Sequence, residues 1–328
     1  MNITENTMML KNDAATFNSI VSTMDAIQKE THDVLANRLS VTDGIQLTYR
    51  DDDRISRKPL SDFAFSQCCT HMGVPTSYMQ RCFEKDAVGM VDSNLNYWLK
   101  QSDKTFLIRE YKDHVRGMLT EKYTQFDAPE ILDVVGNIIN PDDYNIVGHY
   151  ATEERLHIRM RELDPLPIAG EDLFGGLTID SSDVGRCGFR ISYFVYKQVC
   201  TNGLCISKGG GVLYSQKHIG IKSDEVARQI ASNLENLPFF RQEIIDQINR
   251  NKGKALTEAE MEKIFAKLKT QQAVGDKRIE EIRTLMETRY DHSRFGLING
   301  ITEVAQKYSL DKRIDLEKFA GQLLMAAA

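Results

Sequence analysis

The spacing of apolar residues is helical near the start of the chain. Between residues 14 and 32, Phe17, Ile20, Met24 and Ile27 recur at three- and four-residue intervals, which predicts one amphipathic helix. Residues 34–41 and 45–49 have strand character and flank a turn of the Asp-Gly type, so they predict a hairpin. Three short helices are then predicted at residues 61–72, 75–83 and 88–100, with Trp98 inside this cluster.

The middle of the chain changes to a period of two, which is typical of strands. Residues 105–111 and 114–119 bracket Lys112-Asp113 and predict a second hairpin. A helix is predicted from about Asp127 to Ile139, because an acidic cap, a first-turn proline and Glu130 stand at its start. Further strands are predicted at residues 144–150, 155–162, 177–181, 188–199 and 212–216.

Helical spacing returns after Lys222 and continues to the end. Ser223-Asp224-Glu225 is a start signal, and Thr257-Glu258-Ala259-Glu260 is a capping box. The pattern predicts an α+β protein: a central, mostly antiparallel sheet with an N-terminal helical cluster and a helical C-terminal region. The predicted units are residues 1–103 (hairpin and helical cluster), 104–222 (sheet domain) and 223–328 (helical region, a possible assembly or partner surface).

Composition limits the classes of function. The chain has 328 residues and a formal net charge of -6, from 41 basic and 47 acidic side chains, so phosphate contacts would need a local patch rather than a general cationic field. No apolar run approaches the ~18 residues of a membrane span and no export signal is visible, so a cytoplasmic location is expected. The six cysteines are accordingly expected to be free thiols.

One strand carries an unusual charge pattern. In Arg155-Leu156-His157-Ile158-Arg159-Met160-Arg161 every basic side chain falls on one face and every apolar one on the other. Guanidiniums on alternate residues lie roughly 6.5–7 Å apart, a spacing suited to the phosphates of an extended nucleic-acid strand. The alternative is a solvated outer face of a sheet, neutralised by the glutamates nearby.

The hairpin at 106–119 and the residues after it supply a second basic strand with tyrosines. Together with the first strand, they could form a groove of charge and stacking surface of the kind that single strands prefer, with Phe189 and Tyr193 also along it. Co-location of the two basic strands on one sheet face is the condition for this groove. The predicted nucleic-acid-binding residues are Arg155, His157, Arg159, Arg161, Arg109, Lys112, Arg116, Lys122, Tyr111, Tyr123 and Arg190.

Other chemistries have less support. The segment Cys200-Thr201-Asn202-Gly203 is predicted to be a structural motif, a strand end with a tight Asn-Gly turn. A zinc clip of Cys200 and Cys205, completed by Cys187 and His218, matches no standard spacing, so no metal or cofactor is expected. Lys208-Gly209-Gly210-Gly211 lacks the ending of a P-loop, and Asp51-Asp52-Asp53 has no second ligand set.

Catalysis is not indicated by any motif. No serine stands in a Gly-x-Ser-x-Gly elbow, and His149 and His157 are interpreted as polar sheet residues rather than bases. The sequence therefore predicts a protein that is not evidently an enzyme.

Several segments taken together resemble a known family. They are Gly73-Val74-Pro75-Thr76-Ser77-Tyr78, Val115 to Tyr123, Val199 to Leu204, and Asn299-Gly300-Ile301-Thr302-Glu303. Over most of residues 55–310 the chain resembles the phage/plasmid-like domain-of-unknown-function 932 family, although Gly300 and Ile301 depart from its usual Ala-Val. The family has no activity to carry over to these residues.

The resemblance implies a mobile-element context, in a phage, prophage or plasmid. With the basic strands, it leads us to expect a cytoplasmic, homo-oligomeric accessory protein that binds single-stranded DNA, as in recombination or annealing. The alternative is a non-catalytic interaction protein that binds a host or phage protein, such as an anti-defence factor. A nuclease or nucleotide-modifying enzyme is a third possibility without support from metal-ligand spacing.

Overall fold

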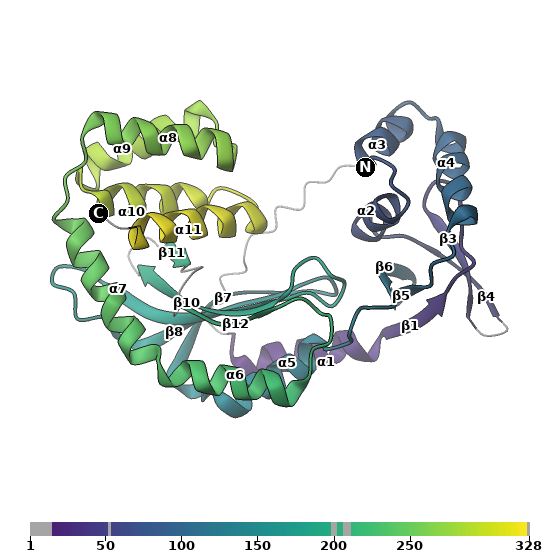
Figure 1. Cartoon of the computed structure of the whole chain (residues 1–328), viewed down its shortest axis with the longest axis horizontal. Coiled ribbons are helices and arrows are strands. Elements are labelled where there is room, and N and C mark those ends of the chain that lie inside the picture. Colours follow the sequence, from purple (N-terminus) through teal and green to yellow (C-terminus); the bar gives the residue numbers. More distant parts are fainter. Residues whose placement is uncertain (1–14, 52–53, 198–201, 206–210, 327–328) are drawn as a thin grey trace.

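The computed structural model describes residues 15–51, 54–197, 202–205 and 211–326. It is an α+β structure with antiparallel sheets and with helices in both its N-terminal and C-terminal parts, so the predicted fold class is confirmed. Figure 1 shows two lobes, a smaller N-terminal one and a larger C-terminal one. Strand β1 of the smaller lobe continues from α1, which lies in the larger lobe. Among the described residues no helix is long and apolar enough to cross a membrane.

The N-terminal lobe has its own hydrophobic core. Three helices pack on two three-stranded sheets within the described residues, of order β1-β5-β6 and β2-β3-β4. The helices are α2 (Asp62–His71), α3 (Thr76–Glu84) and α4 (Val88–Gln101). The strands are β1 (Thr31–Ala36), β2 (Ser40–Thr42), β3 (Gln46–Asp51), β4 (Arg54–Pro59), β5 (Phe106–Tyr111) and β6 (His114–Thr120).

The C-terminal lobe is built on a six-stranded antiparallel sheet, counted over the described part of the chain. Its order is β11-β10-β9-β8-β7, and β12 pairs with the first half of β10. The strands are β7 (Tyr144–Ala151), β8 (Leu156–Pro165), β9 (Leu173–Ser181), β10 (Phe189–Lys197), β11 (Asn202–Cys205) and β12 (Val212–Gln216).

Helices cover both faces of this sheet. The apolar face packs against α1 (Phe17–Lys29), α5 (Ala128–Ile138), α6 (Ser223–Glu235) and α7 (Leu237–Lys252), with the turn η1 (Pro141–Asp143) before β7. On the opposite side lie α10 (Arg294–Ala305) and α11 (Leu310–Met325), and beyond them α8 (Glu258–Gln272) and α9 (Asp276–Thr288) (Figure 1). β8 is consequently an interior strand whose first half is buried on both faces.

The capping box that starts α8 is present as predicted. The Thr257 hydroxyl accepts a hydrogen bond from the backbone N–H of Glu260 at 3.3 Å, and the Glu260 carboxylate accepts one from the backbone N–H of Thr257 at 2.9 Å. Two N–H groups that a helix start leaves unpaired are thereby satisfied.

Replacing Thr257 with alanine should therefore lower the free energy of unfolding by about 1 kcal/mol. Urea titration followed by circular dichroism measures the change. Thr270→Ala is the matched control, because Thr270 is an exposed threonine inside the same helix, where its hydroxyl bonds only to the Ala266 carbonyl. An equal loss in both variants would contradict the role of the cap.

Three local predictions were wrong. Residues 34–41 do not form one strand: β1 pairs with β5, and the hairpin at the Asp43-Gly44 turn is β2 with β3. Trp98 lies on the outer surface of α4 with 47% of its side chain exposed, because Val91, Leu95 and Leu99 form the buried stripe. Asn202 and Gly203 are strand residues of β11 that pair with Lys197 and Tyr196, so they do not form a turn, and Cys200 and Thr201 lie outside the described residues.

The two basic strands do not share a sheet. β5 and β6 form the predicted hairpin, with Lys112 at a positive φ of 53° in its turn, but β5 pairs with β1 in the N-terminal lobe. β8 lies in the six-stranded sheet of the other lobe. The expectation that residues 104–222 form one sheet is therefore wrong. The β5–β6 hairpin belongs to a separate sheet, which Val34 and its neighbours on β1 complete.

Candidate functional site

The polar face of the large sheet is filled by arginines that already have partners. On β8, His157, Arg159 and Arg161 point to the face on which α10 and α11 lie, as the alternation predicted, and His157 and Arg159 are buried. A polar row crosses the sheet at His157, with Tyr150, Asp180, Arg190 and Ser215 opposite one another on successive strands.

Arg159 forms a buried ion pair with α11. Its two terminal nitrogens donate to the two carboxylate oxygens of Glu317, one of them at 3.1 Å, and Arg313 donates to the same carboxylate at 2.9 Å. Both Arg159 and Glu317 are almost inaccessible to solvent. Burial alone would raise the pKa of Glu317, but the attraction of the two arginines outweighs burial and lowers it. Glu317 is therefore ionised and anchors α11 to β8.

Arg155 is neutralised in the same way. It donates to Asp180 on β9 at 2.9 and 3.0 Å and also pairs with Asp311 at the start of α11. Burial opposes ionisation of Asp180, but the contacts from His157 and Arg155 outweigh burial and lower its pKa to about 2. Two of the three arginines predicted to hold phosphates thus hold carboxylates of their own chain.

His157 lies between these two ion pairs. Its Nε2 accepts a hydrogen bond from Arg159 Nε at 3.3 Å, and its Nδ1 lies 3.6 Å from Asp180. Burial lowers the pKa of His157, so the ring is neutral and carries its proton on Nδ1. This arrangement is that of a structural histidine.

Arg161 and Arg190 complete the predicted residues on this face. The Arg161 guanidinium stacks on the ring of Phe174 at 4.1 Å from the ring centre. Arg190 is half-buried, and its Nε lies 3.4 Å from the Ser215 hydroxyl. Among the described residues, no carboxylate lies within ion-pair distance of Arg190.

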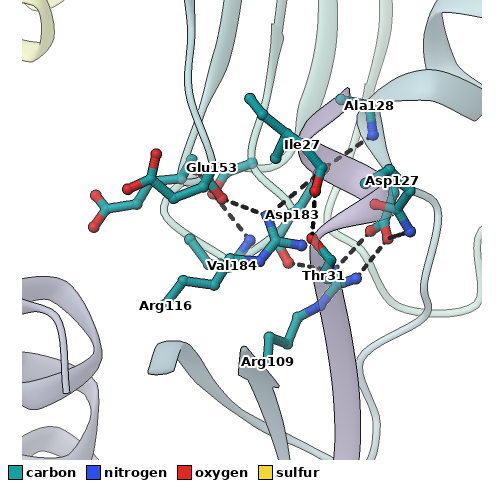
Figure 2. A network of polar contacts seen from close by, with 12 residues as sticks. Ile27, Thr31, Arg109, Arg116, Asp127, Ala128, Glu153, Asp183 and Val184 are labelled. Carbon is teal, nitrogen blue, oxygen red and sulfur yellow. Dashed lines mark hydrogen bonds and ion pairs between the residues drawn. The ribbon is translucent and has the colours of Figure 1, made fainter. Parts of the chain in front are cut away.

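A second network joins the two lobes around Arg109 (Figure 2). The buried Arg109 guanidinium binds Asp33 on β1 at 2.9 Å, Asp127 before α5 at 2.5–2.7 Å, and the Asp183 carbonyl at 2.6 Å. Asp127 stands at the predicted cap position of α5, yet its side chain caps nothing. The carboxylate of Asp183 instead accepts the first backbone N–H of that helix, from Ala128, at 3.0 Å.

Arg116 enters the same network with fewer partners. It is fully buried, and it donates to the Glu153 carbonyl and lies 3.9 Å from Asp183. Its Nε and one terminal nitrogen have no hydrogen-bond partner. Burial and the nearby charge of Asp127 raise the pKa of Asp183 to about 7. Figure 2 shows Arg116 beside Asp183 and Glu153, and Arg109 beside Asp127.

The predicted tyrosines do not provide a stacking surface. The Tyr123 ring is stacked on His218, with the ring centres 5.2 Å apart, and its hydroxyl donates to the Ser182 carbonyl. Tyr111 is half-buried against His114. Phe189 and Tyr193 are buried in the core. The exposed members of the predicted set are the two lysines, Lys112 and Lys122.

The described residues contain no group of three or more His, Cys, Asp or Glu side chains arranged for a metal ion. His218, a predicted alternative zinc ligand, is hydrogen-bonded to the Ser181 hydroxyl at 3.1 Å, and burial lowers its pKa to about 4. Cys187 is a free thiol. The structure does not describe the side chains of Cys200, Cys205 and Asp51, nor the residues at 52–53 and 209–210.

Comparison with known proteins identifies the family. The family model described as "Domain of unknown function (DUF932)" matches residues 115–322. The chain belongs to the DUF932 family. The match begins inside β6, so it includes the whole six-stranded sheet and the helices around it except α1, and it extends nearly to the end of α11. No curated protein and no solved structure matches the chain significantly.

The acidic partners of the arginines were not predicted from the sequence. One signal was present for Glu317, because it falls in the buried stripe of α11 with Ile314 and Leu324, where an ionisable residue needs a partner. Asp33, Asp127 and Asp183 carry no comparable signal, since a carboxylate on a short strand, at a helix start or in a loop is ordinarily exposed.

Proposed function

We propose that this DUF932 protein is a cytoplasmic, single-stranded DNA-binding accessory protein of a phage or plasmid. We further propose that it binds the DNA strand through cationic side chains near the start of β10 and the end of β12, rather than through the arginines of β8. The observation that supports this placement is the state of Arg190, which shares the polar face of Arg159 yet is half exposed and has no carboxylate partner among the described residues.

Two exposed lysines lie near Arg190. Ser215 and Gln216 on β12 pair with Arg190 and Phe189 on β10, and Lys217 follows directly. The backbone N–H of Thr124, two residues after Lys122, donates to the carbonyl of His218, the residue after Lys217. The backbone segments that carry Lys122, Arg190 and Lys217 are therefore neighbours in the structure. Like Arg190, neither lysine has a carboxylate partner in the described structure.

This arrangement favours contacts with the phosphate backbone. With Tyr123 and Tyr111 engaged inside the protein, no predicted ring is left to stack on bases, so sequence preference should be small and salt dependence strong. The ion-paired arginines then have the supporting role of fixing the sheet and the helices around it.

The test is a fluorescence-anisotropy titration of a labelled oligothymidylate at several salt concentrations. The triple variant Lys122→Ala, Arg190→Ala, Lys217→Ala should bind at least about tenfold more weakly than the wild type at low salt. Its slope of log affinity against log salt should also be smaller by about 2, since each lost contact with a single strand removes about 0.7.

The matched control removes the same charge elsewhere. Lys263, Lys267 and Lys277 are exposed lysines of α8 and α9, and replacing all three with alanine should leave the affinity within about twofold of the wild type. Absence of binding by the wild type at low salt would refute the proposed function. An equal loss in the two triple variants would refute the proposed surface.

A further inference from the structure

A cavity of about 480 Å³ with both polar and apolar lining lies where the β8–β9 loop, the end of β10, the end of α7 and the start of α10 meet. This volume is within the range of about 300–1,000 Å³ typical of small-molecule sites. None of the residues predicted from the sequence to bind nucleic acid lines it. The lining includes Glu171, Lys197, Lys252, Tyr290, Phe295 and Asn299.

Two ammonium groups converge on one carboxylate inside this cavity. Lys197 Nζ lies 2.9 Å and Lys252 Nζ lies 3.2 Å from the carboxylate of Glu171. All three side chains are largely buried, so the surplus positive charge is only partly screened by solvent. Among these three largely buried side chains, Glu171 neutralises one lysine and leaves the charge of the other unbalanced.

The other charged residues of the lining, Asp172, Arg289 and Asp291, are exposed, so solvent screens their charges. Arg289 pairs with Glu303 at 2.9 Å. The Asp291 carboxylate accepts a hydrogen bond from the backbone N–H of Ser293 at 3.0 Å and one from the Ser293 hydroxyl. The start of α10 also adds the partial positive charge of a helix N-terminus. The centre of the cavity therefore favours an anionic group.

Aromatic rings beside the lysines indicate a ligand that is larger than a simple anion. Lys197 Nζ is 5.4 Å from the centre of the Tyr290 ring and 5.8 Å from that of Phe295. Gly296 lets the first turn of α10 pack against this wall, because a Cβ there would lie 2.1 Å from the Asp291 carbonyl oxygen. An anion site next to aromatic surface is suited to a phosphate that carries a planar ring system.

The cavity also lies where two segments of the family resemblance meet. Asn299 opens the C-terminal segment, and Lys197 pairs in register with Asn202 of the Cys-Thr-Asn-Gly-Leu segment. Strand β11 packs against both α10 and α11. These segments are far apart in sequence, so their meeting at one cavity is a consequence of the fold.

We propose that this cavity binds a small phosphorylated ligand of nucleotide size, with Lys197 and Lys252 on the phosphate and the Tyr290 and Phe295 rings beside the base. In the free protein Glu171 occupies the anion position, and the ligand phosphate replaces it. The proposal is independent of single-strand binding, because it uses neither Arg190 nor Lys122 nor Lys217.

Isothermal titration calorimetry of the full chain with deoxyadenosine monophosphate tests this site. Lys197→Met and Lys252→Met should each weaken binding by about tenfold or more, because each removes a charge-assisted contact. Glu171→Gln should tighten binding several-fold, because the competing carboxylate is gone. Lys254→Ala, a half-buried lysine outside the cavity lining, is the control and should bind as the wild type does.

Deoxyadenosine is the matched ligand control, and its affinity should be at least about tenfold lower than that of the monophosphate. Circular dichroism and thermal unfolding establish that each variant is folded. Weaker binding by Glu171→Gln would overturn the proposal, since it would indicate a cationic ligand. So would equal affinity for the nucleoside and the nucleotide, or the absence of binding by both the wild type and Glu171→Gln.

Discussion

Replacing Glu317 with alanine should lower the free energy of unfolding by about 3–5 kcal/mol, the loss typical of a buried ion pair that loses one partner. The expected effect is large because Arg159 stays fully buried without a carboxylate, and Arg313 loses the same partner. Urea titration of the wild type and the variant, followed by circular dichroism, measures the change.

A control and a compensating variant make this result specific. Glu258→Ala removes an exposed ion pair with Arg283 and should cost less than about 1 kcal/mol. The double variant Arg159→Met, Glu317→Leu removes both charges of the fully buried pair and should recover part of the loss, while Arg313 still loses this carboxylate. A cost for Glu317→Ala as small as that for Glu258→Ala would show that the Arg159 guanidinium finds water or another partner.

Most of the secondary structure follows from local patterns. Three patterns each located an element correctly. They are the capping box at Thr257 for α8, the period of two for β7 and β8, and the helical spacing around Val226 for α6. The sequence-based predictions failed where the pairing of a β-strand depends on residues far away in the chain. β1 could have continued into the next hairpin by its own pattern, but Val34 to Ala36 instead complete a sheet with β5, far along the chain.

The candidate site shows the same limit more clearly. Alternation correctly placed Arg155, Arg159 and Arg161 on one face, but a period of two is the same whether that face meets solvent, nucleic acid or a helix. The deciding residues, Asp311 and Glu317, are on α11, at the opposite end of the sequence. A local pattern can reveal that a charge needs a partner, but not which partner it has.

The two ion-pair networks also explain how this fold holds its parts together. Arg109 joins β1 and β5 to the start of α5, while Arg155 and Arg159 join the sheet to α11. Between them, Ser182 and Asp183 follow the end of β9, where Ser182 donates to the Glu154 carbonyl and Asp183 lies beside Arg116. A change of charge at Asp183 should therefore affect the contact between the lobes.

The contribution of Asp183 to stability should fall as the pH rises from about 4 to 7, and Asp183→Asn should remove this contribution. The pKa of Asp183 in the folded protein, about 7, lies above the ordinary value because of burial and the charge of Asp127, so folding takes up a proton in this range. The stability contributed by protonated Asp183 is complete below the unfolded pKa of about 3.9 and is lost as the pH passes through the folded one. The loss is on the order of 3–4 kcal/mol.

The side chains facing Asp183 allow a clean comparison. They are Arg116 on β6, Arg109 on β5, Asp127 before α5, and Tyr123, all of which remain in the variant. An asparagine keeps the oxygen that accepts the Ala128 N–H but has no charge to desolvate. Urea titrations at pH 5, 6, 7 and 8 should show the variant gaining stability relative to the wild type as the pH rises, with Asp133→Asn, an exposed carboxylate of α5, as the control. A difference between Asp183→Asn and the wild type that stays constant across this range would mean that Asp183 is ionised throughout it, held so by Arg109 and Arg116.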